Sequence, residues 1–520
     1  MKRFNVTGLC IPAKHYMVDT SEKIKQIKAL VDEGFYFTIN RARQYGKTTT
    51  LYLLRQQLKD EYIAVSISFE GVGIEPFDTV QDFCAMFTGQ VRDALKFSTA
   101  NESYAESWYD ETVTSFDLLK KHITKLCKDT KLVLLIDEVD KTSNNQVFLG
   151  FLGMLRDKYL AEQQGMDFTF HSVVLAGVND IKTIKLKLIN QGLYTPKQGE
   201  GIHNSPWNIA INFTVDMSFN PVEIETMLQQ YENDHHSGMD KAAIAQRIYD
   251  YTGGYPFLVS RMCQAIDAEL NAQWTADGIQ AAVKIILQED NTLFASLIKT
   301  LNNDAELFDF LYSIVIVGVS YNYNLDNPLV SYSVMYGILK NVQDKVAISN
   351  RIFELRLSNY FISINATTRK ETFGVLQYDI VQNGKFNMEL CLKKFAQHYQ
   401  EIYNELDTKF LEREGRLIFL TYLKPLINGQ GFYHIESQFT DLRRMDLVVD
   451  FNKEQFILEL KLWHGDAKHE EAYSQLAKYL SDKHANEGYL LTFDFRKNKS
   501  RKHTPAWVAF EGKKIFDCIV

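Results

Sequence analysis

Residues 35–54 read FYFTINRARQYGKTTTLYLL and carry the strongest pattern in the chain. The first five, Phe35–Ile39, are a short apolar run with the length and residue types of a buried strand. A turn over 40–45 follows, and GKTT at 46–49 then opens a helical pattern of leucines. This is the order of a phosphate-binding loop, in which backbone N–H groups and the helix N-terminus face the anion. In such a loop the Lys reaches the outer phosphates and the hydroxyl holds Mg²⁺.

The loop departs from the full pattern at one position. The pattern places a Gly five residues before Gly46, and the sequence has Arg41 there. The short motif Gly46-Lys47-Thr48 also fits an ordinary helix N-terminus that is capped by the hydroxyl of Thr48. The motif alone therefore leaves both interpretations open.

An acidic strand further along the chain favours the nucleotide site. Leu132–Ile136 is an uninterrupted apolar run, and Asp137 and Glu138 follow it directly. In metal-assisted hydrolysis of a nucleoside triphosphate, one acid holds the Mg²⁺ hydration shell near Thr48 and a second polarises the attacking water. We assign Asp137 to the first role and Glu138 to the second. Solvated acids at a strand end are common, but both patterns in this order predict a site for ATP and Mg²⁺.

The composition is that of a globular chain, with 520 residues, 46% hydrophobic residues and a net charge of −8. This length predicts three or four domains. No apolar run has the length of a membrane span and the N-terminus lacks a signal-peptide core, so we expect a cytoplasmic protein without a membrane partner. The six cysteines are scattered without a CxxC pair, which indicates reduced core thiols. The charge argues against coating of nucleic acid through bulk charge, but not against a local basic groove.

Strands and helices alternate through residues 1–220, which predicts an α/β domain whose parallel sheet binds its ligand at the carboxyl ends of the strands. Asn179 follows one of these strands and is a candidate sensor of the terminal phosphate, although an Asx turn explains it equally well. The predicted helices cover 21–33, 79–97 and 107–128, and the further strands cover 63–69, 168–176 and 207–215.

Residues 221–290 have a helical pattern and are predicted to form a lid over the nucleotide. They contain YTGGYP at 251–256, whose Gly-Gly-x-Pro turn starts a helix. Arg261 lies one turn into that helix and is a candidate phosphate contact, although a surface Arg is the simpler explanation.

Residues 291–370 mix helices with a predicted two-stranded wing, in which 345–348 pairs with 359–364. This arrangement fits a small winged-helix-like domain. Residues 371–400 are predicted to be a connector that leads to the C-terminal domain, 401–520.

Six segments together resemble a bacterial family of AAA-ATPase-like proteins: INRARQYGKTTTLYLL, LVLLIDEVDK, SPWNIAINFTVDMSF, YTGGYPFLV, DNPLVSYSVMYGIL and NRIFELRLSNYF. The resemblance covers nearly the whole chain. It implies a P-loop ATPase followed by a C-terminal, restriction-endonuclease-like domain of the PD-(D/E)xK nuclease superfamily, and it allows a homo-oligomer. The family loop is similar to Arg-Pro-Arg-Arg-Phe-Gly-Lys-Ser, so Arg41 in place of Gly is a family feature. The resemblance implies that Arg41, Arg43, Gly46 and Thr49 join Lys47 in binding the nucleotide; the absent Pro and one absent Arg affect only the expected rigidity of the loop.

The C-terminal domain carries a second chemical pattern. Strands at 445–451 and 455–461 read as a hairpin, with Asp446 at the start of the first and Glu459 and Lys461 on one face of the second. Two carboxylates that bind Mg²⁺ or Mn²⁺, with a Lys that stabilises developing charge, are what phosphodiester hydrolysis needs. Amphipathic hairpins carry such triples often. Charges inside an apolar strand are nevertheless costly unless they have a use.

Further residues of this domain are weaker candidates. The family shows a Gln beside its active site, which implies Gln475 on a predicted helix over 470–480, whereas Glu436 and Glu414 fit exposed acids. The basic run 496–503 could steer a phosphate backbone, but such runs are more often solvated loops.

Two functions follow from these patterns. The first is an ATP-dependent or ATP-regulated nuclease that acts on nucleic acid, with DNA as the expected substrate. The second is a nucleotide-switched module that holds nucleic acid or a protein without cutting it. A third interpretation is that the Arg-containing loop binds no nucleotide and the N-terminal domain is a scaffold.

Overall fold

The chain forms two compact units, which are described separately. Unit 1 is Met1–Ala295 with Ser331–Ile338, and unit 2 is Ser296–Val330 with Leu339–Val520. The computed structural model describes residues 2–98, 101–139, 146–178, 207–317, 319–368, 380–382, 384–403, 408–427, 431–437, 445–452, 454–494 and 504–520.

Unit 1 contains a four-stranded parallel sheet in the order β1-β4-β3-β2, which confirms the predicted parallel α/β sheet. Its strands are β1 (Phe37–Asn40), β2 (Ile63–Ser68), β3 (Leu132–Asp137) and β4 (Ser172–Gly177). β4 separates the strand that leads into Gly-Lys-Thr from the acidic strand. Because parallel strands end at the same edge, the loop and the two acids share one end of the sheet.

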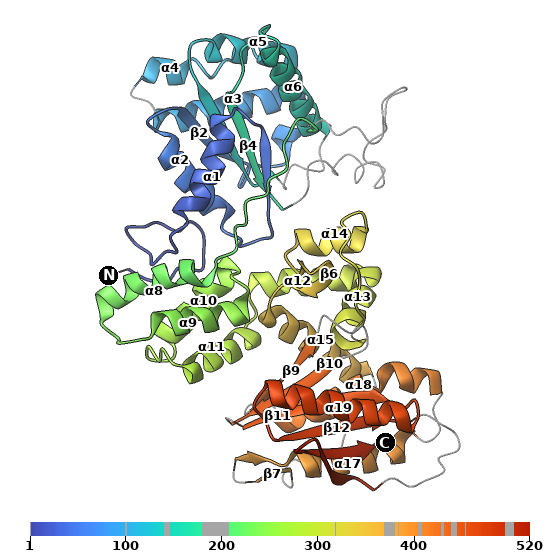
Figure 1. Ribbon diagram of the computed structural model, residues 1–520. Helices are drawn as coiled ribbons and strands as arrows, with labels where there is room; N and C mark the ends of the chain where they lie inside the picture. The colour runs from blue at the N-terminus through green and yellow to red at the C-terminus, as the bar shows by residue number, and fades with distance from the viewer. Residues whose placement is uncertain are drawn as a thin grey trace. The chain divides into compact units, whose positions relative to one another are not determined.

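Helices cover both faces of this sheet (Figure 1). α1 (Ser21–Asp32) and α2 (Lys47–Leu58) pack on one face through residues such as Ile27 and Leu54. α3, α5 and α6 pack on the other through residues such as Phe87 and Leu152. Since both faces are covered, every residue of β3 is buried, which explains its uninterrupted apolar run. The helices of the second face, with two short elements beside them, are η1 (Glu75–Phe77), α3 (Val80–Lys96), α4 (Glu102–Glu106), α5 (Phe116–Cys127) and α6 (Gln146–Gln163).

Two predicted elements of unit 1 need correction. The segment 207–215 lies beside β1 but makes only the isolated bridge Phe37↔Ile211 instead of a strand. Residues 207–210 form a turn, in which the N–H of Ala210 donates to the carbonyl of Trp207 at 3.2 Å. Further along the segment, the carbonyl of Val215 accepts the Arg41 guanidinium at 2.7 Å. The helix predicted over 107–128 begins only at Phe116, because the side chain of Ser115 caps its N-terminus.

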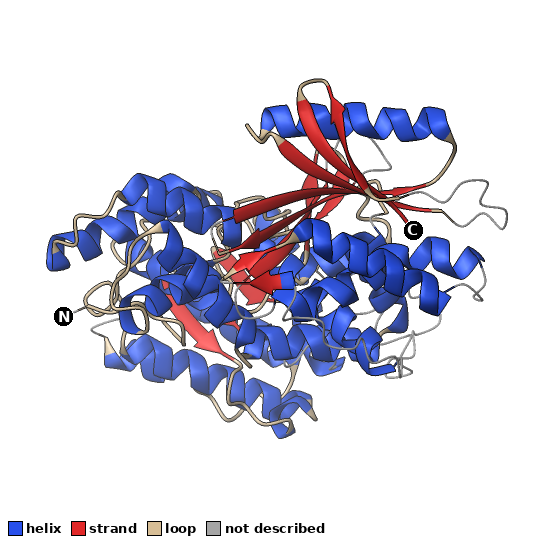
Figure 2. Cartoon of the chain, turned by 90° about the horizontal axis from the view of Figure 1, so that it is seen from below, coloured by secondary structure: helices blue, strands red, loops and turns tan. Residues whose placement is uncertain are grey.

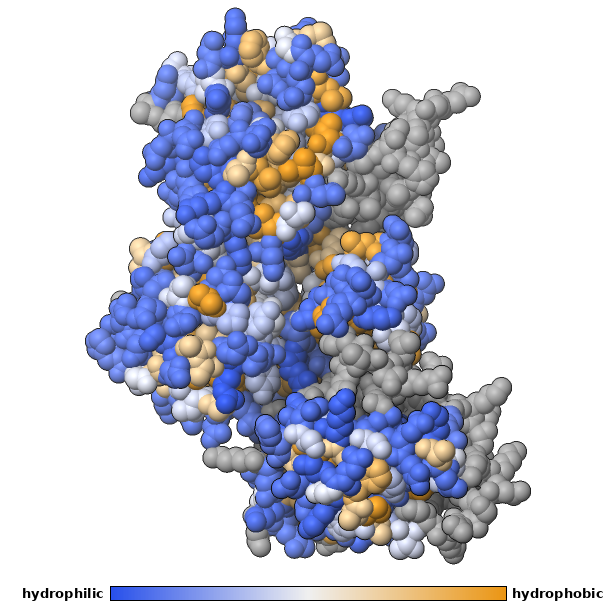
Figure 3. All heavy atoms as spheres, viewed as in Figure 1, coloured by the Kyte–Doolittle hydropathy of each residue, from blue (hydrophilic) through white to orange (hydrophobic). Residues whose placement is uncertain are grey.

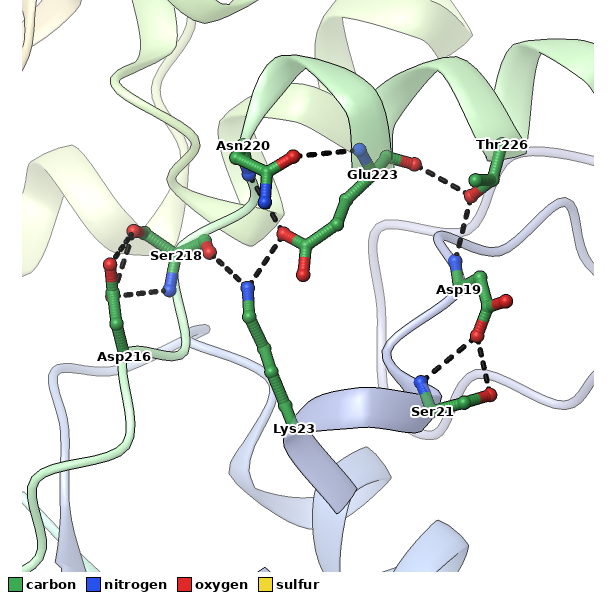
Figure 4. A network of polar contacts seen from close by, with 8 residues as sticks. All are labelled: Asp19, Ser21, Lys23, Asp216, Ser218, Asn220, Glu223 and Thr226. Carbon is green, nitrogen blue, oxygen red and sulfur yellow. Dashed lines mark hydrogen bonds and ion pairs between the residues drawn. The ribbon is translucent and has the colours of Figure 1, made fainter. Parts of the chain in front are cut away.

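Four helices follow the sheet domain and confirm the helical pattern of 221–290: α8 (Pro221–His235), α9 (Lys241–Thr252), α10 (Pro256–Ala268) and α11 (Ala276–Gln288). A polar network joins the start of α8 to the start of α1 (Figure 4). The Lys23 ammonium contacts Glu223 at 2.6 Å, and Asn220 and Glu223 form a reciprocal capping box. Asp19 donates its backbone N–H to Thr226 at 2.8 Å. These bonds fix the first of the four helices against α1.

Gly254 occupies a crowded position between α9 and α10. Its φ is +71°, and a Cβ there would lie 2.0 Å from the carbonyl oxygen of Phe219. We expect Gly254→Ala to lower the free energy of unfolding by about 2–5 kcal/mol, as strain and overlap add. Urea unfolding of both variants measures this, with Gly8→Ala as the control.

The control isolates the effect of the overlap. Gly8 also has a positive φ, +61°, but nothing lies within 4 Å of the position that a Cβ would take. Gly8→Ala should therefore cost only about 1–2 kcal/mol. Equal losses of unfolding free energy in the two variants would show that backbone strain alone, without the overlap, explains the effect of Gly254→Ala.

Unit 2 is built on a mixed six-stranded sheet in the order β13-β14-β12-β11-β10-β9. α19 covers one face and is the helix that lies alone along one side of the large sheet in Figure 2. Its Leu476 and Leu480 join Leu490 in the core. α17 and α18 cover the other face, where Phe493 meets Phe395 of α17 and Gly415 of α18. The strands are β9 (Gly431–Ser437), β10 (Met445–Phe451), β11 (Glu454–Leu462), β12 (Glu487–Phe493), β13 (Ala506–Phe510) and β14 (Lys513–Ile519).

The remaining elements precede this sheet or flank it. α12 (Thr292–Asn303) and α14 (Pro328–Met335) each continue from one unit into the other along the chain. The others, all in unit 2, are α13 (Ala305–Tyr312), η3 (Ser313–Val317), β5 (Leu339–Val342), β6 (Lys345–Ile348), α15 (Arg351–Thr368), β7 (Val381–Gln382), β8 (Lys385–Phe386), α17 (Met388–Tyr403), α18 (Thr408–Ile427) and α19 (Asp466–Asp482).

Two predicted segments of unit 2 also need correction. β6 pairs with β5, whereas 359–364 belongs to α15. The side chain of Asn350 accepts the N–H of Phe353 and so starts a helix, whose Phe353, Leu357 and Phe361 are buried at helical spacing. The end of the connector predicted over 371–400 forms most of α17 (Met388–Tyr403), because the apolar face of this helix packs on the sheet.

Large apolar side chains on the surface are scattered. Examples among the described residues are Ile74, Phe97 and Met166. The face seen in Figure 3 is mostly hydrophilic, although orange side chains gather in the middle of its upper part. None of the helices in the described ranges combines the length and the apolar character that crossing a bilayer requires.

Candidate functional site

The loop between β1 and α2 has the shape that an anion site requires. Gln44 and Gly46 both have positive φ, 58° and 79°. Alternating backbone conformations of this kind turn successive N–H groups toward one side. Arg41 donates its backbone N–H to Gly177 at 3.1 Å, which fastens the start of the loop to the end of β4. Gly46 then caps α2, whose first N–H groups have no acceptor within the helix.

Lys47, Thr48 and Asp137 come together at the carboxyl end of the sheet. Lys47 is 7% exposed, and its ammonium donates to the carbonyl oxygens of Arg41 and Ala42, both at 3.0 Å. The Thr48 hydroxyl donates to Asp137 Oδ2 at 2.6 Å. The two patterns found in the sequence therefore meet in one place, with a hydroxyl and a carboxylate as adjacent oxygen ligands.

Glu138 follows Asp137 in an unusual conformation. Its φ is 56°, in the left-handed region, and its backbone N–H donates to Asp137 Oδ1 at 2.9 Å. Non-glycine residues with such backbone strain are found disproportionately at functional sites. The turn places a half-buried second carboxylate immediately beyond the strand end.

Two further polar atoms near the loop were not singled out from the sequence. The side-chain oxygens of Asn40, at the end of β1, and of Gln44, within the loop, are buried without a hydrogen bond to any described residue. Buried polar atoms of this kind need a partner, and a bound ligand is one such partner. The sequence indicates these two oxygens only weakly, through a polar residue at the end of the strand that precedes Gly-Lys-Thr.

Other predicted nucleotide contacts have protein partners. The Arg41 guanidinium donates to the carbonyls of Asn40 and Val215 and lies 5.2 Å from the ring of Phe213, and burial lowers its pKa. The Thr49 hydroxyl accepts the N–H of Cys10 at 3.2 Å. Their roles toward a nucleotide stay predictions, as does that of Arg43, whose side chain is exposed.

Arg261 lies in α10 and is held by two acids. Its Nε donates to Glu289 at 2.7 Å, and its guanidinium lies 2.6 Å from Glu269. Burial lowers the pKa of Arg261, but these hydrogen bonds outweigh burial and raise the pKa overall. Its predicted contact with a phosphate is not tested by this arrangement. Asn179 lies outside the described residues.

In unit 2 the hairpin of β10 and β11 pairs Asp446 directly with Glu459 in the backbone register. Glu436 of β9 is the neighbour of Asp446 on its other side. The Glu459 side chain is 2% exposed, and Lys461 Nζ lies 2.6 Å from its Oε1. The carboxylate and the ammonium therefore share the face of the sheet that α19 covers.

Two helices supply further polar groups to unit 2. Gln475 of α19 has a buried side-chain oxygen that makes no hydrogen bond to a described residue. Arg416 of α18 was not singled out from the sequence; burial lowers its pKa to about 10, while the charge of Glu459 acts in the opposite direction. Its guanidinium also donates to the carbonyl of Ile316 at 3.4 Å.

A second polar cluster joins α19 to the sheet and was also missed. Asp517 Oδ2 on β14 accepts the Tyr473 hydroxyl at 2.8 Å and lies 3.1 Å from His469 Nε2. His469 Nδ1 lies 3.4 Å from the Thr492 hydroxyl, so both ring nitrogens have protein partners. Within the described part of the chain, three or more His, Cys, Asp or Glu side chains do not gather as a metal site. The basic run 496–503 lies outside the described residues.

Comparisons with known proteins identify the family of residues 11–361. No curated protein matches the chain. A Walker-type ATPase of Pyrococcus abyssi matches with 11% identity and a TM-score of 0.47, over 68% of this chain and 99% of that one. The ORC2 protein of Aeropyrum pernix, in ADPNP–ADP complexes, matches with 11% identity and a TM-score of 0.34, over 66% and 93%. The model of the AAA-like domain family matches residues 11–361, which include the loop, the acidic strand and the four helices α8–α11. The chain therefore belongs to the AAA-like domain family.

Proposed function

We propose that unit 1 binds ATP with Mg²⁺ and hydrolyses the nucleotide. The observation that carries this proposal is the contact between the Thr48 hydroxyl and Asp137, beside the buried ammonium of Lys47. Membership of the AAA-like domain family supports an ATPase-like function. The unpartnered side-chain oxygens of Asn40 and Gln44 add buried polar atoms that a ligand would satisfy.

A residue at the start of α2 and one at the end of β3 together suit a magnesium ion. Thr48 and Asp137 offer a hydroxyl and a carboxylate, and hard cations prefer such oxygen ligands. Bound Mg²⁺ would neutralise charge on the phosphate oxygens. Lys47 would turn from the loop carbonyls to the outer phosphates, while Glu138 would orient the attacking water and accept its proton.

The first test separates hydrolysis from binding. Glu138→Gln keeps the shape of the side chain but removes the base, so ATP binding should stay within about twofold while phosphate release falls about a hundredfold or more. Calorimetric titration with ATP·Mg²⁺ and a phosphate-release assay measure the two quantities.

Glu33→Gln is the matched control for this variant. Glu33 is an exposed acid at the end of α1. Its replacement by Gln should change neither ATP binding nor phosphate release. A Glu138→Gln protein that releases phosphate at the wild-type rate would exclude Glu138 as the base.

We further propose that the C-terminal domain hydrolyses DNA with Asp446, Glu459 and Lys461, and that the nucleotide state of unit 1 controls it. The support is the pairing of Asp446 with Glu459 and the contact between Glu459 and Lys461 inside an apolar strand. Gln475, with its unpartnered buried oxygen, would bind the attacking water or the phosphate. Mg²⁺ or Mn²⁺ on the two acids would supply the hydroxide.

A second candidate is a nucleotide-switched module that holds nucleic acid or a protein without cutting. The observation that favours it is that the Lys461 ammonium lies 2.6 Å from Glu459 Oε1, as in a purely structural ion pair. Incubation with Mn²⁺ and plasmid DNA, with and without ATP, separates the two candidates. Binding without cleavage supports the module.

The domain division belongs to the same proposal. Residues 1–220 would be the ATPase core, 221–290 its lid, 291–370 a winged-helix-like domain and 401–520 the nuclease-like domain. The connector, 371–400, would end within α17. A cytoplasmic homo-oligomer would place a second copy beside the nucleotide, and light scattering with and without ATP would detect it.

A further inference from the structure

The backbone around Tyr255 restricts the direction in which its side chain can point. It is the N-cap of α10, between Gly254, which the carbonyl of Phe219 crowds, and Pro256 at the first helical position. Proline has a fixed φ and Gly254 accepts no side chain, so this turn has little freedom. The Tyr255 side chain is consequently held in the interior and is 2% exposed.

The Tyr255 side chain reaches the phosphate-binding loop. Its hydroxyl donates to the backbone carbonyl of Arg43. Its ring meets the ring of Tyr45 edge-on, with 4.7 Å between centroids. On another side, a Cβ on Gly337 would lie 3.3 Å from the Tyr255 ring and 3.2 Å from the Cβ of Ala42. The loop is thus packed against α10 through one tyrosine.

The bond to Arg43 also fixes the peptide that follows. A trans peptide is planar, and its C=O and N–H point in opposite directions. With the carbonyl of Arg43 held by Tyr255, the N–H of Gln44 must point away from Tyr255. Gln44 itself is in the left-handed region at φ 58°, a strained conformation that a non-glycine residue keeps only where its surroundings hold it.

We propose that Tyr255 is a positioning residue for nucleotide phosphates, because its hydroxyl orients the peptide between Arg43 and Gln44 so that the N–H of Gln44 faces the anion. The inference rests on the proposed nucleotide binding of unit 1. It explains how a loop without a first Gly keeps its shape: Arg41 is tied to Val215 at one end, and Arg43 is tied to Tyr255 in the middle. Burial raises the pKa of Tyr255 well above its usual value, so the hydroxyl remains a donor.

The test compares two tyrosines that make the same kind of bond. Tyr36 is also fully buried, and its hydroxyl donates to the carbonyl of Phe170 at 2.9 Å, at the amino end of β4. Tyr255→Phe and Tyr36→Phe each remove one hydroxyl from a carbonyl. We expect Tyr255→Phe to weaken ADP binding about three- to tenfold in calorimetric titration of the full chain, and Tyr36→Phe to change it less than about twofold.

Thermal unfolding without nucleotide completes the comparison, because both variants should lose stability alike. Equal ADP affinity in the two variants would overturn the role of Tyr255 while leaving nucleotide binding intact. A wild-type protein that binds no ADP would instead overturn the proposed function, so the two failures are distinguishable.

Hydrogen exchange of the wild-type protein provides a measurement that needs no variant. If Tyr255 links the loop to α10, ADP should slow exchange in residues 41–48 and in 251–258 together. Protection of 41–48 alone would contradict the proposal even if Tyr255→Phe failed to fold.

Discussion

Lys47→Ala should weaken the binding of ATP·Mg²⁺ about a hundredfold. The ammonium is held among the loop carbonyls of Arg41 and Ala42, within a short side-chain movement of any anion bound in the loop. A hydrogen bond from a cation to a phosphate contributes about 1.5–3 kcal/mol, and each 1.4 kcal/mol is a factor of about ten in affinity. Calorimetric titration of the full chain measures the change.

Lys59→Ala is the matched control, since Lys59 is an exposed lysine at the far end of the same helix. It should bind ATP as the wild type does. If Lys47→Ala also binds like the wild type, the loop is not a nucleotide site and unit 1 is a scaffold. Thermal unfolding of both variants shows whether a loss of affinity merely reflects a loss of folded protein.

The parallel sheet of unit 1 could be predicted because its signals are local. Buried strands such as β3 are continuous apolar runs, and Gly46-Lys47-Thr48 marks a strand-to-helix turn. The parallel direction of the strands also follows from such signals, because strand–helix–strand units impose a parallel arrangement. These signals brought Thr48 and Asp137 to the same end of the sheet, and the structure joins them at 2.6 Å.

The segment 207–215 could not be predicted in the same way. Its alternating apolar residues fit a strand, and Phe213 does stack on Phe37. Residues 207–210 nevertheless form a turn, and the Arg41 guanidinium binds the carbonyl of Val215, across 174 positions in sequence. Local periodicity indicates neither the turn nor the distant partner.

Tyr255 illustrates the same limit at the candidate site. Its hydroxyl bonds the carbonyl of Arg43, 212 positions away, and the sequence shows only a Gly-Gly-x-Pro turn. In unit 2, periodicity indicated the hairpin that pairs Asp446 with Glu459, but not the approach of Arg416 from α18. Local patterns predict elements and the residues at their ends, whereas long-range polar partners depend on how the elements pack.

Lys461→Ala should reduce Mn²⁺-dependent cleavage of plasmid DNA at least about a hundredfold. In the proposed nuclease, the ammonium would stabilise negative charge that develops on the phosphate, and removal of one such group typically costs about two to three orders of magnitude in rate. The assay measures linear and nicked products with Mn²⁺, with and without ATP. Loss of cleavage in this variant also excludes a contaminating nuclease as the source of activity.

Lys468→Ala supplies the control for the loss of an ion pair. Lys468 contacts Glu471 at 2.8 Å on the exposed side of α19, so the pair adds little stability and its lysine does not enter the hairpin. Cleavage by this variant should equal that of the wild type. If wild-type protein binds DNA but does not cut it, and Lys461→Ala only lowers the unfolding temperature, then the buried pair of Glu459 and Lys461 is structural. The C-terminal sheet would in that case serve a nucleotide-controlled binding module, because DNA would be bound without being cut and the loss of the ion pair would affect only stability.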